Sequence, residues 1–295
     1  MRDKEFAGIF PYLVTPTDKS GKVKEEVLAG LVDHLISKGV HGLTPLGSTG
    51  EGVYLSLKVR LRVVEIVVDR AASRVPVVPC VNSMTTAEAV KEAKEMEARS
   101  ADGIVIAVPT YFPPGEKELI THFRSIAEAV TCPVVLYSNP KLSKWSFTIP
   151  MLKALCELEN IKYIKDASGN MGKLLSIMNA VGDKIKVFSA SAHIPLFVFM
   201  MGGVGWMAGP ACLIPEHCVK LYRLAKEKKW NEALGLQRKV WAFNEIFQKY
   251  SLAACVKAGL ELQGFPVGQP LAPQRQLDPY GMEEIRNLMK KFDVF

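Results

Sequence analysis

The stretch that decides the fold runs from residue 103 to residue 137. It begins with a β-branched apolar run, Gly103–Val108 (GIVIAV), and continues through a segment with helical period, Glu116–Val130 (EKELITHFRSIAEAV). It ends in a second apolar run, Pro133–Tyr137 (PVVLY). Because both runs are apolar on both faces, they are typical of buried parallel strands. The stretch therefore predicts one strand–helix–strand unit of a parallel sheet.

The same unit repeats along most of the chain, at intervals of roughly 30 residues. The eight apolar runs are Gly8–Val14, Val40–Leu46, Val75–Val81, Gly103–Val108, Pro133–Tyr137, Ile161–Lys165, Ile185–Ser189 and Gly203–Ala208. The amphipathic segments between them include Glu25–Ser37, Leu57–Arg74, Thr86–Ala98, Glu116–Val130 and Met151–Leu158. Eight such units predict an α/β fold, a (β/α)8 TIM barrel. An open doubly wound sheet is the alternative, but Gly47–Gly52 (GSTGEG) lacks the G-x-G-x-x-G order of its dinucleotide fingerprint.

The pattern changes after about Lys229, where the strand-like runs stop. Three further helices are expected, and a connector rich in glycine and proline precedes the last of them. These segments are Trp230–Tyr250, Ser251–Gln263, the connector Gly264–Pro279 and Tyr280–Lys291. We therefore expect a catalytic barrel domain over residues 1–229 and a C-terminal helical extension over residues 230–295.

Composition narrows the class of protein further. With 295 residues and 48% hydrophobic side chains, the chain can bury a substantial core, and collagen-like or disordered structure is excluded. No apolar stretch approaches the ~18 residues of a membrane helix, and none follows Met1–Glu5 as a signal peptide would require. The cysteines occur singly, in mostly apolar surroundings, which is typical of reduced thiols. They are Cys80, Cys132, Cys156, Cys212, Cys218 and Cys255. We expect a cytoplasmic protein without a membrane partner.

Charge gives a weaker indication of the ligand. Lysine and arginine (37) exceed aspartate and glutamate (30), so that the formal net charge is +7. The basic residues are mostly interleaved with acids, as in Lys91–Glu95 and Lys226–Lys229, which is typical of solvated helix faces. Nucleic acid is therefore not an expected partner, whereas a small carboxylate would benefit from the positive field.

Barrel active sites lie at the carboxyl ends of the strands, so the polar residues that end the runs are candidates. Lys165 ends the sixth run. A lysine at the barrel mouth loses water, its pKa falls, and its amine can attack a ketone to form an imine. An isolated lysine at a strand end is, however, more often a side chain that reaches solvent. Tyr137 ends the fifth run and can therefore meet Lys165 and shuttle a proton, or else remain a rim aromatic with its hydroxyl in water.

Two loops add further candidates. In Gly47–Glu51 (GSTGE), backbone N–H groups and the Ser48 and Thr49 hydroxyls can form a nest for a carboxylate, unless this is an ordinary turn that caps the next helix. Glu51 is expected to stabilise the loop by accepting local hydrogen bonds. Pro109–Pro114 (PTYFPP) is a stiff aromatic loop, whose composition suggests packing or an oligomer contact.

Together these motifs resemble those of the dihydrodipicolinate synthase/N-acetylneuraminate lyase family of class I pyruvate-dependent lyases. The resemblance extends over nearly the whole chain, through the Tyr12–Thr17 region, Gly47–Glu51, Tyr137–Pro140 (YSNP), Ile164–Asp166 (IKD) and Gly202–Gly205 (GGVG). It implies that Lys165 forms a Schiff base with pyruvate or another 2-keto acid, and that Tyr137 is the acid/base beside it. It also implies that Ser48 and Thr49 bind the carboxylate, with Ser48 in the proton relay.

The resemblance implies an assembly as well. Tyr111 matches a tyrosine that reaches into a neighbouring subunit's site, so a homodimer is expected, commonly paired into a homotetramer. The backbone at Ala190 and Met207 would flank the keto acid. No metal and no organic cofactor is implied, because the chemistry runs through the covalent Schiff base on Lys165. The five histidines show no metal-ligand spacing that would favour a metal-dependent aldolase.

Two departures from the family concern the second substrate. In the lysine-pathway synthases an arginine stands at the position of Leu142, where sialic-acid lyases also have a leucine. The nearby Lys141 and Lys144 lack the two-pronged guanidinium of an arginine. Sialic-acid lyases carry an acidic pair that matches Ser189–His193, where this chain has alanine and histidine. The sequence leaves open whether Trp206 and His193 line the site.

The favoured interpretation is a class I lyase, an aldolase or dehydratase, that acts on pyruvate or a 2-keto-3-deoxy acid through Lys165. One alternative is a 4-hydroxy-tetrahydrodipicolinate (dihydrodipicolinate) synthase that condenses pyruvate with aspartate semialdehyde and holds its carboxylate with a lysine. Another is a non-catalytic relative that only binds a keto acid. The second substrate and the direction of the reaction are not determined by these residues.

Overall fold

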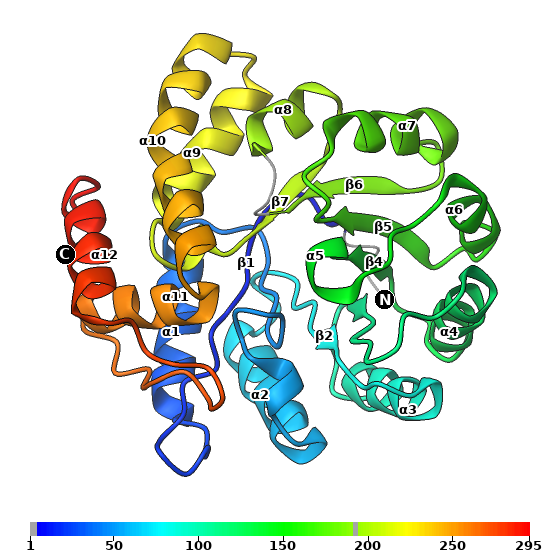
Figure 1. The fold of residues 1–295 in the computed structure, drawn as a ribbon, viewed down its shortest axis with the longest axis horizontal. Helices are drawn as coiled ribbons and strands as arrows, with labels where there is room; N and C mark the ends of the chain where they lie inside the picture. The colour runs from blue at the N-terminus through cyan, green and yellow to red at the C-terminus, as the bar shows by residue number, and fades with distance from the viewer. Residues whose placement is uncertain (1–4, 191–193) are drawn as a thin grey trace.

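Seven short parallel strands form one curved sheet at the centre of the molecule, with helices around it (Figure 1). The strands are β1 (Gly8–Pro11), β2 (Cys80–Val81), β3 (Ile104–Ala107), β4 (Val134–Ser138), β5 (Ile161–Asp166), β6 (Lys186–Ser189) and β7 (Gly205–Ala208). Their order in the sheet is β1-β7-β6-β5-β4-β3-β2. The structure, a computed structural model, describes residues 5–190 and 194–295, and describes Leu142 by its backbone alone.

The expectation of eight strands is wrong at the second run, residues 40–46, which is not a strand. It makes isolated parallel bridges instead, between Thr44 and Tyr12 on one side and between Leu43 and Val77 on the other. Prolines within this run and before β2 supply no N–H, so neither ladder can be extended. For the same reason β2 begins later than expected. The bridges nevertheless connect β1 to the chain that leads into β2, and so link the two edges of the sheet.

Helices follow the strands along the chain and cover the outside of the sheet (Figure 1). They are α1 (Glu25–Ser37), α2 (Leu57–Ala71), α3 (Thr86–Glu97), α4 (Glu116–Glu128), α6 (Ile149–Leu155), α7 (Met171–Val181), α8 (Pro195–Met200) and α9 (Pro215–Lys226). Shorter turns are η1 (Gly52–Tyr54), α5 (Pro140–Ser143) and η2 (Pro210–Cys212). In α4 the buried residues Leu119, Phe123 and Ile126 recur at the spacing of one helix face. This apolar face explains why the segment packs as a helix against the sheet.

The C-terminal segment contains α10 (Trp230–Lys249), α11 (Leu252–Leu262) and α12 (Pro279–Lys290), close to the expected bounds. Figure 1 shows α10 running alongside α9, and the two helices are in extensive contact. The Gln263 amide, just after α11, donates to the Leu213 carbonyl of the barrel at 3.0 Å and to the Val294 carbonyl at 3.2 Å. The C-terminal helices are therefore held against the barrel, and the domain boundary at residue 229 stays a prediction.

All six cysteines are buried and unpaired, in agreement with their apolar surroundings in the sequence. Within the part of the chain that the structure describes, no helix has both the length and the apolar character of a membrane span.

Candidate active site

Lys165 and Tyr137 lie side by side on neighbouring strands, as their positions in the sequence predict. The Cα atoms of the two residues are partners in the register of β4 and β5. The Lys165 side chain is only 5% exposed, and its Nζ lies 4.3 Å from the centroid of the Tyr137 ring. On another side Nζ lies 3.7 Å from the centroid of the Tyr12 ring. The amine is therefore held between two aromatic faces inside the barrel, and not among the outer helices.

The surroundings of Lys165 favour a neutral amine. Burial lowers the pKa of Lys165 to about 7 from its ordinary value near 10.5. The next carboxylate along the chain, Asp166, is paired with Lys173 at 2.5 Å. The aromatic faces favour the ammonium form by roughly 0.5 to 2 kcal/mol, less than the several kcal/mol that burial of a charge costs. A substantial fraction of the amine is therefore unprotonated and nucleophilic at neutral pH.

Two phenols beside the amine remain protonated. Burial raises the pKa of Tyr137 to about 12, against hydrogen bonds from Asn139 Nδ2 at 3.2 Å and from the Ser48 side chain, which lower it. Burial also raises the pKa of Tyr12 well above its usual value, and Cys80 adds to the effect. Both tyrosines can therefore donate a proton to a substrate atom next to Lys165.

Tyr12 is a site residue that the sequence reasoning did not single out. It follows β1 directly, so the rule that strand ends carry the site applies to it as it does to Tyr137. Its hydroxyl accepts from Cys80 Sγ at 3.9 Å and donates to Met207 Sδ at 3.9 Å. These sulfur contacts orient the ring beneath the amine.

The loop Gly47–Glu51 lies against this tyrosine. A Cβ at Gly47 would collide with the Tyr12 ring, so glycine is required for the close approach. The Thr15 hydroxyl donates to the Gly50 carbonyl at 2.7 Å and holds the loop in place. The Thr49 hydroxyl is 1% exposed and has no hydrogen-bond partner in the described structure. A buried hydroxyl without a partner is suited to an anionic ligand.

Glu51 stabilises the loop, but through remote partners and not through the local hydrogen bonds that the sequence suggested. Its Oε2 lies 2.6 Å from Lys257 Nζ on α11, and both side chains are almost fully buried. Its Oε1 accepts from Leu271 N at 2.6 Å and from Gln274 Nε2 at 3.0 Å. The C-terminal helical segment packs over the strand ends, and the Glu51 carboxylate therefore ties the loop to this segment.

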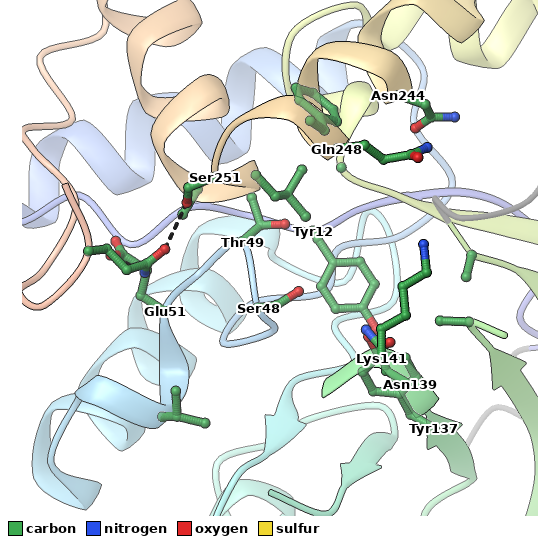
Figure 2. Close-up of a pocket in the computed structure, with 18 of the residues that line it drawn as sticks. Tyr12, Ser48, Thr49, Glu51, Tyr137, Asn139, Lys141, Asn244, Gln248 and Ser251 are labelled. Carbon is green, nitrogen blue, oxygen red and sulfur yellow. Dashed lines mark hydrogen bonds between the residues drawn. The ribbon is translucent and has the colours of Figure 1, made fainter. Parts of the chain in front are cut away.

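The amine and the loop open into a cavity of about 640 Å³ (Figure 2). The barrel side of the cavity is lined by Lys165, Tyr137, Tyr12, Ser48 and Thr49. Its other walls come from α5, α10, α11 and the segments that adjoin them. The residues on these walls include Asn139, Lys141, Asn244, Phe247, Gln248, Ser251, Leu252 and Gln274. The cavity is thus lined by neutral polar and apolar groups, the Glu51 carboxylate and one lysine ammonium, in addition to the buried amine.

The remaining candidates are placed differently. Ala190 is buried and lines the cavity. Met207 is fully buried in β7 and points toward Tyr12. Gly209, two residues after Met207, lines the cavity. Because side chains alternate along a strand, the buried Trp206 faces the outer helices. Tyr111 is 81% exposed and meets Phe112 edge-on at 4.9 Å between ring centroids.

Two candidates lie outside what the structure describes. They are the side chain of Leu142 and the residue His193. In the described part of the chain, no group of three or more histidine, cysteine, aspartate or glutamate side chains is arranged to hold a metal ion.

Comparison with known proteins agrees with this geometry. Residues 5–292 match the dihydrodipicolinate synthetase family. A 4-hydroxy-tetrahydrodipicolinate synthase of Bartonella quintana is 33% identical over 270 residues, which are 90% of this chain and 92% of that protein. A chloride-inhibited dihydrodipicolinate synthase of Acinetobacter baumannii, solved with pyruvate, superimposes with a TM-score of 0.93 at 26% identity and covers 98% of this chain and 99% of its own.

A prophage protein of the dihydrodipicolinic acid synthase family from E. coli K12, also solved with pyruvate, superimposes with a TM-score of 0.91 at 26% identity. It covers 98% of this chain and 99% of its own. The curved sheet and the match over nearly the full length thus agree with the resemblance found in the motifs. The chain belongs to the dihydrodipicolinate synthetase family.

Proposed function

We propose that the protein is a class I lyase that forms an imine between Lys165 and the carbonyl of pyruvate or a 2-keto-3-deoxy acid. The observation that carries this proposal is the buried amine, which is clamped between two tyrosine rings and has a pKa of about 7. Its position at the inner end of a cavity gives a small 2-keto acid access to it. That two relatives were solved in complex with pyruvate supports the choice of keto acid.

The steps follow from the groups around the amine. Nζ adds to the C2 carbonyl, the carbonyl oxygen leaves as water, and an iminium remains. The iminium withdraws electrons, so a C3 proton or a C3–C4 bond can be lost to give an enamine. The enamine then attacks an aldehyde, takes up a proton or expels a hydroxyl from C4. Tyr137 exchanges the protons, with Ser48 as its relay, while Ser48 and Thr49 hold the carboxylate.

The assembly belongs to the same proposal. Tyr111 and Phe112 are two of the most exposed large hydrophobic residues of the described chain, at 81% and 79%. We assign Tyr111 to the cavity of a second copy, in a homodimer or a homotetramer, because an exposed aromatic pair of this kind is favoured at interfaces. We also propose a (β/α)8 arrangement of the chain. In it, residues 40–46 fill the gap between β1 and β2 and so complete the barrel as an eighth strand.

Borohydride trapping tests the imine. The protein is incubated with pyruvate, reduced with sodium borohydride and mapped by peptide mass spectrometry. A reduced pyruvate adduct is expected on Lys165 and absent in Lys165→Ala. Lys162→Ala is the matched control, since Lys162 lies on the same strand but is exposed, and it should trap as the wild type does. No adduct on Lys165, or full adduct yield in Lys165→Ala, would overturn the proposal and leave at most a protein that binds keto acids.

One observation favours a second candidate, a 4-hydroxy-tetrahydrodipicolinate synthase. Relatives carry this name, and Lys141 lines the cavity, where its ammonium can bind the carboxylate of aspartate semialdehyde. Coupled turnover of pyruvate and aspartate semialdehyde separates this activity from the others. Rates no higher than those of Lys165→Ala reject it, whereas a raised KM for the semialdehyde alone in Lys141→Gln supports it.

A further inference from the structure

Asn139 occupies the N-cap position of α5, yet its side chain does not cap that helix. Asparagine is among the preferred N-cap residues, because its side-chain oxygen can accept from the first free N–H groups of the helix. In the described structure no such hydrogen bond forms at α5. The Asn139 Nδ2 instead donates to the hydroxyl oxygen of Tyr137 at 3.2 Å (Figure 2). The side chain therefore contacts the residue that we propose as the acid/base.

Asn170, the N-cap residue of α7, shows the ordinary use of an asparagine at this position. Its Oδ1 accepts from Lys173 N at 2.9 Å, within the first turn of its own helix. At α5 only the main chain of Asn139 takes part in the helix, since its carbonyl accepts from Ser143 N and from Ser143 Oγ, both at 2.9 Å. The helix α5 thus holds the backbone of Asn139 and leaves the side chain to Tyr137.

The hydrogen bond from Asn139 restricts the direction of the Tyr137 proton. An amide nitrogen carries donors alone, so the Tyr137 oxygen accepts from it and its own hydrogen must point elsewhere. The remaining directions lead to the Ser48 side chain and to the cavity that Asn139 and Tyr137 both line. A donor at the phenol oxygen also stabilises the phenolate more than the phenol, because a hydrogen bond to a charged acceptor is roughly twice as strong.

Other titratable groups lie near the Tyr137 ring or on the walls of the same cavity. They are Lys165, Tyr12, Cys80, Asp166, Lys141 and Glu51. Burial raises the pKa of Tyr12 and of Cys80, so both are neutral near pH 7. The two carboxylates are each paired with a lysine. Burial also raises the pKa of Tyr137, and the hydrogen bond from Asn139 opposes that rise.

We propose that Asn139 is a positioning residue for proton transfer, which holds the Tyr137 oxygen and stabilises it as a phenolate while its proton is on the substrate. This inference rests on the proposed imine at Lys165. In the carbinolamine that Nζ forms with the keto acid, Tyr137 gives its proton to the C2 hydroxyl, which leaves as water, and Tyr137 becomes a phenolate.

The phenolate then takes a proton from C3 and becomes a phenol again. The electrons of the C3–H bond form the C2–C3 double bond of the enamine, while one electron pair of the C2–N double bond returns to Nζ. Both steps pass through the phenolate of Tyr137. Loss of the Asn139 donor is therefore expected to slow both of them.

The test separates the amount of imine from the rate of proton transfer. The protein is incubated with pyruvate in D2O, and exchange of the C3 protons is followed by proton NMR. The amount of imine at equilibrium is measured in parallel by a brief borohydride pulse at increasing pyruvate. Because Tyr137 is a phenol both before and after imine formation, this amount should not depend on Asn139.

Asn139→Leu removes the donor and keeps water from taking its place. We expect the wild-type half-saturation for pyruvate and a C3 exchange ~10- to 100-fold slower, the effect of one hydrogen bond to a charged oxygen. A merely structural role would change the half-saturation along with the rate.

Further variants show whether Asn139 acts through Tyr137 and as a donor. Tyr137→Phe should exchange slowly, and Asn139→Leu added to it should slow exchange no further. Asn139→Asp keeps the shape of the side chain but replaces the donor by an acceptor, so exchange should again be slow. Asn170→Leu is the matched control, since it removes a cap hydrogen bond and should lower the melting temperature without changing C3 exchange.

The outcomes separate this inference from the proposed function. If the wild type traps no pyruvate, the imine proposal fails, and the role of Asn139 falls with it. If pyruvate is trapped but its C3 protons do not exchange, or exchange equally fast in Asn139→Leu, the role of Asn139 alone is wrong. The same holds if Asn139→Asp exchanges as the wild type does, or if Asn139→Leu slows Tyr137→Phe as much as it slows the wild type. A half-saturation that rises in step with the loss of exchange would also overturn it.

Discussion

The Nζ of Lys165 lies 3.7 Å from the centroid of the Tyr12 ring, although Tyr12 follows the edge strand β1, Lys165 lies in β5 at the middle of the sheet order, and the two residues are far apart in the sequence. The ring face favours the ammonium form, while burial favours the neutral amine. Tyr12 thus limits how far the pKa of the amine falls. Tyr137 acts in the same direction from the neighbouring strand.

Replacement of the Tyr12 ring should therefore lower the pKa of Lys165 further. In Tyr12→Leu we expect the pH dependence of the trapping rate to move to lower pH by roughly half a unit to one unit, the equivalent of one cation–π contact. Tyr12→Phe keeps the ring and is the control, with little shift expected. A pH profile of borohydride trapping at saturating pyruvate measures both. A shift to higher pH in Tyr12→Leu would contradict this account.

The lowered pKa of Lys165 also predicts a pH-dependent cost in stability. Between pH 7 and 10.5 the unfolded chain binds a proton at this lysine that the folded chain does not, so stability rises with pH in that window. Below pH 7 the full loss of stability that comes from burying Lys165 is present. Lys165→Met should therefore melt several degrees higher than the wild type at pH 6, and the difference should shrink as the pH approaches 10. Calorimetry at several pH values tests this, and a difference that grows with pH would be the wrong sign.

The Glu51–Lys257 pair should be essential to the stability of the C-terminal segment. Glu51→Gln leaves the Lys257 ammonium buried without a counter-charge, which typically costs ~3 to 5 kcal/mol. We expect a lower midpoint in urea unfolding for Glu51→Gln and for Lys257→Met, and partial recovery in the double variant.

The control for this prediction is Glu227→Gln, which removes the exposed ion pairs of Glu227 with Lys229 and Arg223 and should change the midpoint little. If Glu51→Gln were as stable as Glu227→Gln, the anchoring role of Glu51 would be wrong. A double variant less stable than both single ones would also contradict a direct pairing.

Tyr111 can be tested by complementation between subunits. If Tyr111 enters the site of a second copy, neither Lys165→Ala nor Tyr111→Ala should be active alone, since each lacks one component of every site. Co-expressed, the two variants form hybrids in which one site combines an intact lysine with an intact tyrosine. We expect part of the activity to return in the hybrids. No recovery in hybrids verified by mass spectrometry would place Tyr111 outside the partner's site.

The sequence by itself determined the class of fold and the heart of the site. Runs apolar on both faces, separated by amphipathic helices, can be buried only as a parallel sheet covered by helices. In such a sheet the ends of neighbouring strands meet at one edge, so the sequence alone places Lys165 and Tyr137 together, and the register of β4 and β5 agrees. The number of strands was overestimated, because prolines interrupt the ladders around residues 40–46.

Only the tertiary structure decided what surrounds that pair. The position of Tyr12 beneath the amine and the pairing of Glu51 with Lys257 both depend on how β1 and the C-terminal helices approach the strand ends. No local periodicity encodes such contacts, since they join elements that are distant in the chain and are selected by packing and burial. The lysine that we propose as the nucleophile could thus be found from the sequence, whereas the outer wall of the cavity could not.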